Sequence, residues 1–163
     1  MNSIRALIRG PLTAEEERCV AGLEAWATAY ALPGGCAERM VDEVYADQPE
    51  VVSVLTGTVV ARHGADKTAW RKLEGAMEAL YRERHVVFTA VYPRGNTIAI
   101  EARIEQVLHD GTRRGWPFAV FLTFDDAGRI VTDHTYMQPP PTQKMFDDAA
   151  KAAQTANSRG SNA

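Results

Sequence analysis

The clearest hydrophobic pattern lies between His85 and Gln138, where apolar and polar positions alternate. From Ile98 to Glu105 the alternation is strict, as is typical of a strand with one buried face. Arg94-Gly95-Asn96 and Asp125-Asp126-Ala127-Gly128 have the composition of tight turns. This region therefore predicts three long antiparallel strands joined by two tight turns.

Helical periodicity precedes the strands. Thr13-Ala14-Glu15-Glu16 fits a capping box, so a helix should begin after Thr13 and end before Pro33-Gly34-Gly35. A second, shorter helix should carry Met40 to Tyr45 and stop before Asp47-Gln48-Pro49. Its boundaries rest on the apolar spacing and on the proline.

A third helix should follow Asp66 as its N-cap, with an apolar stripe from Trp70 to Leu80. Between the second and third helices, Glu50 to Arg62 is rich in Val and Thr, and predicts a strand or a strand plus an irregular segment. The order helix, helix, strand, helix and three strands indicates an α+β fold with a cone-shaped, curved antiparallel sheet wrapped around the N-terminal helices.

The length of 163 residues fits one domain, which we place at 1–141. Pro139 to Pro141 should end strand pairing, because proline cannot donate to a sheet. The segment 142–163 is rich in Ala, Asn and Ser, and we expect a loose, flexible tail with a short helix near Phe146.

The chain resembles the nuclear-transport-factor-2-like superfamily, in its SnoaL-like and ketosteroid-isomerase-like branch. The resemblance covers about Glu15 to Met137 and depends on the order and spacing of short stretches. These are Ala25 to Tyr30, Tyr45 to Val51, Asn96 to Ala102, Phe121 to Val131, and His134 to Met137. It implies a cystatin-like cone with a pocket at its open end. Members of the superfamily isomerise ketosteroids, cyclise polyketides, hydrolyse epoxides or dehydrate their substrates, and others bind ligands without catalysis.

Arg103-Ile104-Glu105 is similar to the Arg-x-Asp strand of limonene-epoxide-hydrolase-like enzymes, with Glu in place of Asp. The second acid of those enzymes falls on Thr135, and the nearest carboxylate is Asp133 on the same face of the strand. The Tyr and Asn that hold water there have no counterpart in Val51-Val52-Ser53-Val54, and the oxyanion-hole residues of ketosteroid isomerase have no clear position in this chain.

Alternation also groups the candidate site residues. If Glu101, Arg103 and Glu105 face the pocket with Asp133, a guanidinium lies among three carboxylates, which suits acid–base catalysis. The candidate catalytic residues are therefore Arg103, Glu105 and Asp133. The candidate substrate-binding residues are Trp26, Tyr30, Glu101, Trp116, Phe118 and Thr135. The alternative is that the charged row is a solvated or dimer-facing strand surface with structural ion pairs.

Composition narrows the partners. A net charge of −3 offers no basic stripe for nucleic acid, and no apolar run approaches the roughly 20 residues of a membrane span. Cys19 and Cys36 lack metal-type spacing and are expected to be reduced thiols in a cytoplasmic protein, with no metal or cofactor. Both faces of Trp116 to Phe124 are largely apolar, which predicts a homodimer.

Three functions from different classes remain open at this point. The first is a cofactor-free isomerase, cyclase or dehydratase acting on a small hydrophobic molecule, with Glu105 or Asp133 as acid or base. The second is an epoxide hydrolase built around Arg103. The third is a non-catalytic small-molecule-binding or assembly module in which the charged row is structural.

Overall fold

The computed structural model describes residues 3–62 and 67–137. Its helices and strands are η1 (Ile4–Leu7), α1 (Ala14–Tyr30), α2 (Ala37–Arg39), the π-helical turn η2 (Met40–Val44), β1 (Tyr45–Ser53), β2 (Thr58–Ala61), α3 (Thr68–Glu78), β3 (Tyr81–Arg94), β4 (Thr97–Leu108), β5 (Arg113–Phe124) and β6 (Ile130–Met137). The predicted N-cap Asp66, the predicted tail 142–163 and the predicted helix near Phe146 lie outside the described residues.

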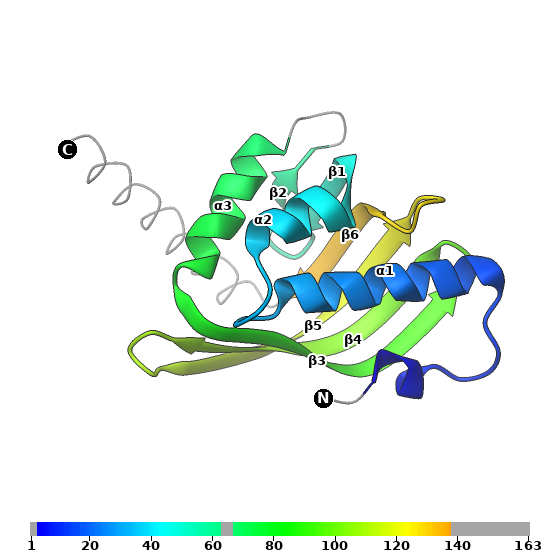
Figure 1. The fold of residues 1–163 in the computed structure, drawn as a ribbon, viewed down its shortest axis with the longest axis horizontal. Helices are drawn as coiled ribbons and strands as arrows, with labels where there is room; N and C mark the ends of the chain where they lie inside the picture. The colour runs from blue at the N-terminus through cyan, green and yellow to red at the C-terminus, as the bar shows by residue number, and fades with distance from the viewer. Residues whose placement is uncertain (1–2, 63–66, 138–163) are drawn as a thin grey trace.

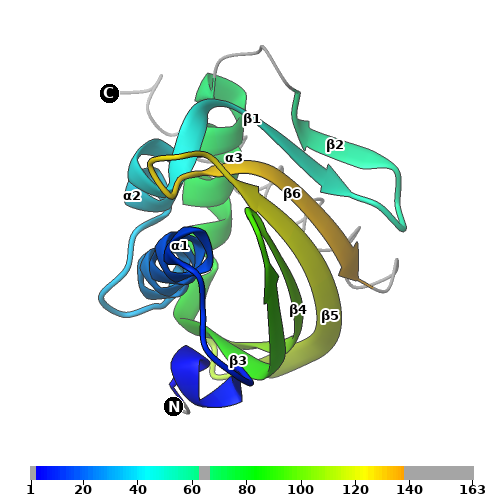
Figure 2. The same cartoon turned by 90° about the vertical axis from the view of Figure 1, so that its right-hand side faces the viewer.

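The strands form one six-stranded sheet in the order β2-β1-β6-β5-β4-β3. Neighbouring strands are antiparallel except β1 and β6, which run parallel. The sheet curves around α1, while α2 and α3 lie over its other end (Figures 1 and 2). The predicted α+β class and curved sheet are thereby confirmed. In the part of the chain described, no helix is long and apolar enough to cross a membrane.

The number of strands and the start of β1 differ from the sequence prediction. The region predicted as three strands contains four, because His109 to Thr112 makes a further tight turn between β4 and β5. In that turn Gly111 has a φ of 87°, and the Asp110 carboxylate accepts a hydrogen bond from the Thr112 amide. Asp47-Gln48-Pro49, predicted as a stop, lies inside β1.

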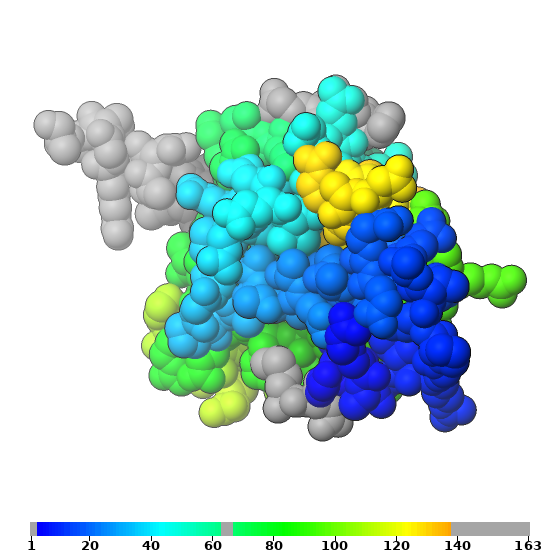
Figure 3. All heavy atoms as spheres, turned by 45° about the vertical axis from the view of Figure 1, so that its right-hand side comes forward, coloured from blue at the N-terminus to red at the C-terminus, as the bar shows by residue number. Residues whose placement is uncertain are grey.

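Helix α1 begins where the sequence predicts. The Thr13 hydroxyl accepts from the Glu16 amide, and the Glu16 carboxylate accepts from the Thr13 amide, which completes the capping box. Its buried face crosses the concave side of the sheet, and the turn after β5 lies directly against it (Figure 3). Gly22 permits this approach, because a Cβ there would lie 2.2 Å from the Gly128 carbonyl oxygen.

The two faces of β4 have opposite environments. Ile98, Ile100 and Ile104 are at most 6% exposed and pack in the main core. Burying such a side chain contributes roughly 1.5–3 kcal/mol, so this face determines which way the strand turns. The alternate row, with Glu101 and Arg103, therefore faces away from the helices and is exposed.

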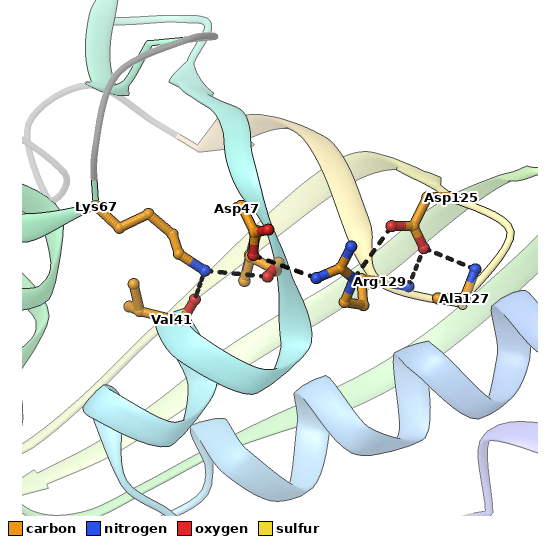
Figure 4. A network of polar contacts seen from close by, with 7 residues as sticks. Val41, Asp47, Lys67, Asp125, Ala127 and Arg129 are labelled. Atoms are coloured by element: carbon orange, nitrogen blue, oxygen red, sulfur yellow. Dashed lines mark hydrogen bonds and ion pairs between the residues drawn. The ribbon is translucent and has the colours of Figure 1, made fainter.

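Polar contacts fix the start of β1 (Figure 4). The Lys67 ammonium donates to the Val41 carbonyl at 2.6 Å and to the Tyr45 carbonyl at 3.1 Å, at the C-terminal end of η2. Nearby, Arg129 forms ion pairs with both Asp47 and Asp125, which joins β1 to the turn before β6. These contacts hold the backbone of Tyr45, whose side chain enters the candidate site.

Candidate functional site

A cavity of about 120 Å³ lies on the concave side of the sheet. Its walls come from α1, η2, β1, β2, α3 and the inner faces of β4, β5 and β6. Most of the lining is apolar, and its aromatic members are Trp26, Tyr30, Tyr45, Trp70 and Phe118. Two carboxyl groups, those of Asp133 and Glu74, also line the cavity. A buried carboxyl in an apolar cavity is unfavourable unless other groups support it, so both acids are candidates for chemistry.

Asp133 lies on β6, is 6% exposed, and has hydrogen bonds to both carboxylate oxygens. The Tyr45 hydroxyl donates to Oδ2 and the Thr135 hydroxyl donates to Oδ1, each at 2.7 Å. Burial raises the pKa of Asp133, while the hydrogen bonds from Tyr45 and Thr135 act in the opposite direction. The carboxylate is therefore fixed in place and is more basic than an ordinary aspartate.

Tyr45 connects Asp133 to the aromatic wall. Its hydroxyl oxygen accepts a hydrogen bond from the Trp26 indole at 3.1 Å, and its ring packs edge-on against Trp70 at 4.5 Å. Burial, followed by the charge of Asp133, raises the pKa of Tyr45 well above its usual value. Tyr45 therefore stays protonated at neutral pH and can serve as a hydrogen-bond donor.

Glu74 places the second carboxyl in the cavity from α3. Its Oε1 accepts a long hydrogen bond of 3.4 Å from Trp70, and its Oε2 lies 3.7 Å from an Arg84 nitrogen. Burial raises the pKa of Glu74, and the positive charge of Arg84 opposes this. Glu74 can therefore carry a proton more readily than an exposed glutamate.

Arg84 is 1% exposed and holds the wall behind Tyr30. Its Nε donates to the Tyr30 carbonyl at 2.9 Å, and its guanidinium lies 4.0 Å from the centre of the Tyr30 ring. Burial raises the pKa of the Tyr30 hydroxyl to about 12. Tyr30 and its stacked neighbour Trp26 thus form a rigid, neutral wall.

The structure brings part of the predicted site together. Trp26, Tyr30, Phe118, Asp133 and Thr135 all line the cavity. Alternation and helical spacing predict that these five residues lie together. Their chemical roles stay predictions.

The other predicted residues lie elsewhere. Glu101, Arg103 and Glu105 face away from the cavity, with the Arg103 side chain 49% exposed and 3.7 Å from Glu105. The expected grouping of Arg103 and Glu105 with Asp133 is therefore wrong. The physical reason is that the isoleucines of β4 take the inner face. Trp116 is half-buried and packs with Met77 and Tyr81 instead of lining the cavity.

Three residues of the site escaped sequence reasoning, although each leaves a signal. Glu74 interrupts the apolar stripe of α3, four residues after Trp70 and three before Met77. Arg84 precedes Val86 in the alternation of β3, so it shares the inner face. Tyr45 lies at the junction between η2 and β1, where periodicity indicates no direction.

No model of a known protein family matches the chain, and no curated protein matches it in sequence. Solved structures do match it. One is a hypothetical protein with a ketosteroid isomerase-like fold from Catenulispora acidiphila, in complex with trimethylamine. It has a TM-score of 0.57 and 21% identity, over 71% of this chain and 83% of that one. The chain has a nuclear-transport-factor-2-like fold.

Two further solved structures share this fold at low sequence identity. A putative SnoaL-like polyketide cyclase from Jannaschia has a TM-score of 0.61 and 12% identity, over 85% of this chain and 97% of that one. An LEH-like epoxide hydrolase of M. tuberculosis has a TM-score of 0.61 and 15% identity, over 88% of this chain and 97% of that one. Enzymes thus occur among proteins of this shape, and the activity must be argued from the cavity.

Proposed function

We propose that the cavity is the active site of a cofactor-free acid–base enzyme of the isomerase, cyclase or dehydratase type. Asp133 is the proton-transferring residue. The observation that carries this proposal is the Asp133 carboxylate, buried among aromatic side chains with both oxygens held by Tyr45 and Thr135. A carboxylate removed from water and fixed in direction is a stronger base than one in solvent.

In this reaction, Asp133 takes a proton from a carbon next to a substrate carbonyl and becomes a carboxylic acid. The electron pair of the broken C–H bond moves toward the carbonyl oxygen. Glu74, whose pKa is raised by burial, supplies a proton at a second position or to a leaving oxygen. Tyr45 and Thr135 hold the Asp133 carboxylate in one orientation throughout.

The dimensions and lining of the cavity define the substrate. A cavity of about 120 Å³ accepts a group close to the size of a benzene ring, since benzene occupies an engineered cavity of about 150 Å³. The aromatic walls favour an apolar body. The substrate is therefore a small hydrophobic carbonyl compound, or the apolar end of a larger one.

Epoxide hydrolysis is the second candidate, and the Arg84–Glu74 pair favours it. Glu74 and Asp133 both line the cavity, and the Arg84 guanidinium lies behind Glu74, 3.7 Å from its Oε2. One carboxylate can take a proton from water while the other acid protonates the epoxide oxygen. The structural similarity to the epoxide hydrolase of M. tuberculosis supports testing this chemistry.

The test is turnover of small enolisable ketones, unsaturated ketones and epoxides by the wild-type protein and by Asp133→Asn. We expect Asp133→Asn to reduce kcat/KM by about 10²- to 10⁴-fold, as for loss of a general base. Glu101→Gln, which changes an exposed carboxylate on the opposite face, is the matched control and should keep full activity. Substrates that bind in the cavity without turning over would contradict an enzyme and indicate a binding module.

A further inference from the structure

A second hollow lies on the convex face of the sheet, beside the turn between β4 and β5. We call it the arginine groove, and its volume is about 460 Å³. The charged side chains around it are Glu83, His85, Arg103, Glu105, Arg113 and Arg114. None of its lining residues lines the cavity that contains Asp133. The proposed acid–base reaction makes no use of this groove.

The groove has a local excess of positive charge. Three arginines face two glutamates, on a chain whose net charge is −3. Arg103 Nε lies 3.7 Å from Glu105, too far for a hydrogen bond, and within the described ranges the Arg103 guanidinium donates no hydrogen bond. His85 lies 3.3 Å from the same glutamate. Arg103 therefore retains donor capacity that a ligand can use.

Gly115 gives Arg103 its position. A Cβ at Gly115 would lie 2.9 Å from both Arg103 Nη2 and the Ile104 carbonyl oxygen, and 3.1 Å from Arg103 Nε, so the guanidinium lies against the bare backbone of β5. The φ of Gly115 is not positive, so the conformation itself does not require glycine. The glycine is needed for space. The arginine is thus supported by two paired strands, and Glu105 is the strand neighbour of Gly115.

We propose that the arginine groove binds a small molecule that carries an oxyanion, either a phosphate or a carboxylate group. Guanidinium groups match both oxyanions with paired N–H donors, which makes arginine the preferred residue for them. Arg103 approaches from β4, and Arg113, the first residue of β5, lies on the same face of the sheet. The ligand therefore contacts donors from both strands of the β4–β5 pair.

Isothermal titration calorimetry of the full chain at low ionic strength tests this proposal, with pyrophosphate and citrate as probes. Binding of pyrophosphate alone indicates a phosphate ligand, and binding of citrate alone indicates a carboxylate. Arg103→Gln and Arg113→Gln should each weaken binding about tenfold or more, in line with the loss of a charged hydrogen bond. Arg94→Gln removes the same charge from the far end of β3 and should leave the affinity unchanged.

Gly115→Ala provides a test that keeps every charge. The added methyl group meets both the Arg103 guanidinium and the Ile104 carbonyl oxygen at 2.9 Å, so the guanidinium and the β4–β5 backbone must both shift, and we expect weaker binding of the same probe. Circular dichroism establishes that each variant is folded, and Arg103→Gln decides the question if Gly115→Ala does not fold. The proposal is overturned if neither probe binds, if the groove variants bind like wild type, or if Arg94→Gln weakens binding as much as they do.

Discussion

At the scale of single residues, Asp133 makes folding stability depend on pH. In the unfolded chain an aspartate releases its proton at about pH 3.9. Burial raises the pKa of Asp133, so in the window above that pH the folded protein still holds a proton that the unfolded chain has lost. Stability then falls as pH rises through this window, and becomes level above the pKa of the folded state.

We therefore expect Asp133→Asn to gain stability relative to wild type as pH rises from about 4 to about 8, because an amide does not ionise. Urea unfolding at several pH values measures the difference between the two proteins. Loss of an acceptor for Tyr45 or Thr135 adds a constant that is independent of pH. A difference that is flat across the series would contradict the raised pKa.

Arg84 and Glu74 form a buried ion pair beside the cavity. Arg84→Met leaves the Glu74 carboxyl without its cation, and we expect a loss of about 3–5 kcal/mol in the free energy of unfolding. Adding Glu74→Met removes the unpaired acid and should recover part of that loss. Chemical denaturation of the two variants measures this. The pair interaction is absent if the double variant is less stable than Arg84→Met alone.

Sequence reasoning found some of these residues because apolar patterns identify faces. Asp133 and Thr135 were placed on one face of the last strand by alternation, and they share a hydrogen bond. The prediction for Arg103 is wrong because the isoleucines beside it take the inner face, and burying them stabilises the fold more than an ion pair at the surface. The apolar stripes of α3 and β3 do not predict Glu74 and Arg84, because a single charged residue on a buried face breaks the pattern that identifies that face.

At the scale of elements, turns and helix ends limited the prediction. The capping box located the start of α1 to the residue, because two reciprocal hydrogen bonds require that spacing. The turn at His109 to Thr112 was not separated from the strands around it, although Asp110 and Gly111 have turn chemistry. The parallel pairing of β1 with β6 depends on contacts distant in sequence, so local patterns cannot indicate it.

Packing between elements can be tested with two glycines that both lie inside helices. Gly22→Ala places a methyl group 2.2 Å from the Gly128 carbonyl oxygen, so α1 must move off the β5–β6 turn. We expect the free energy of unfolding to fall by about 1–3 kcal/mol, or more. Gly75→Ala on α3 meets nothing within 4 Å, and should gain up to about 1 kcal/mol from helix propensity. Thermal unfolding of both variants checks this contrast, and equal effects would contradict it.

At the scale of the whole molecule, the convex face of the sheet divides into two halves. One half is apolar, with Tyr92 exposed on β3, Phe121 on β5 and Tyr136 on β6, and the last two rings in edge contact at 5.8 Å. The other half contains the arginine groove, toward the β4–β5 turn. The sheet pairings place Tyr92, Ala99 and Phe121 in one cross-strand row. The apolar half is thus continuous.

We expect a second copy of this chain to cover the apolar half, because a two-fold axis through the patch brings the same aromatic residues together from both copies. The groove then remains at the edge of the interface. Phe121→Glu should convert the dimer to a monomer, since it buries a carboxylate without a partner. Leu55→Glu, at an equally exposed apolar position in the β1–β2 turn, should leave the dimer intact. Sedimentation equilibrium measures both masses against the 17.9 kDa of one chain, and a wild-type mass equal to that value would contradict the dimer.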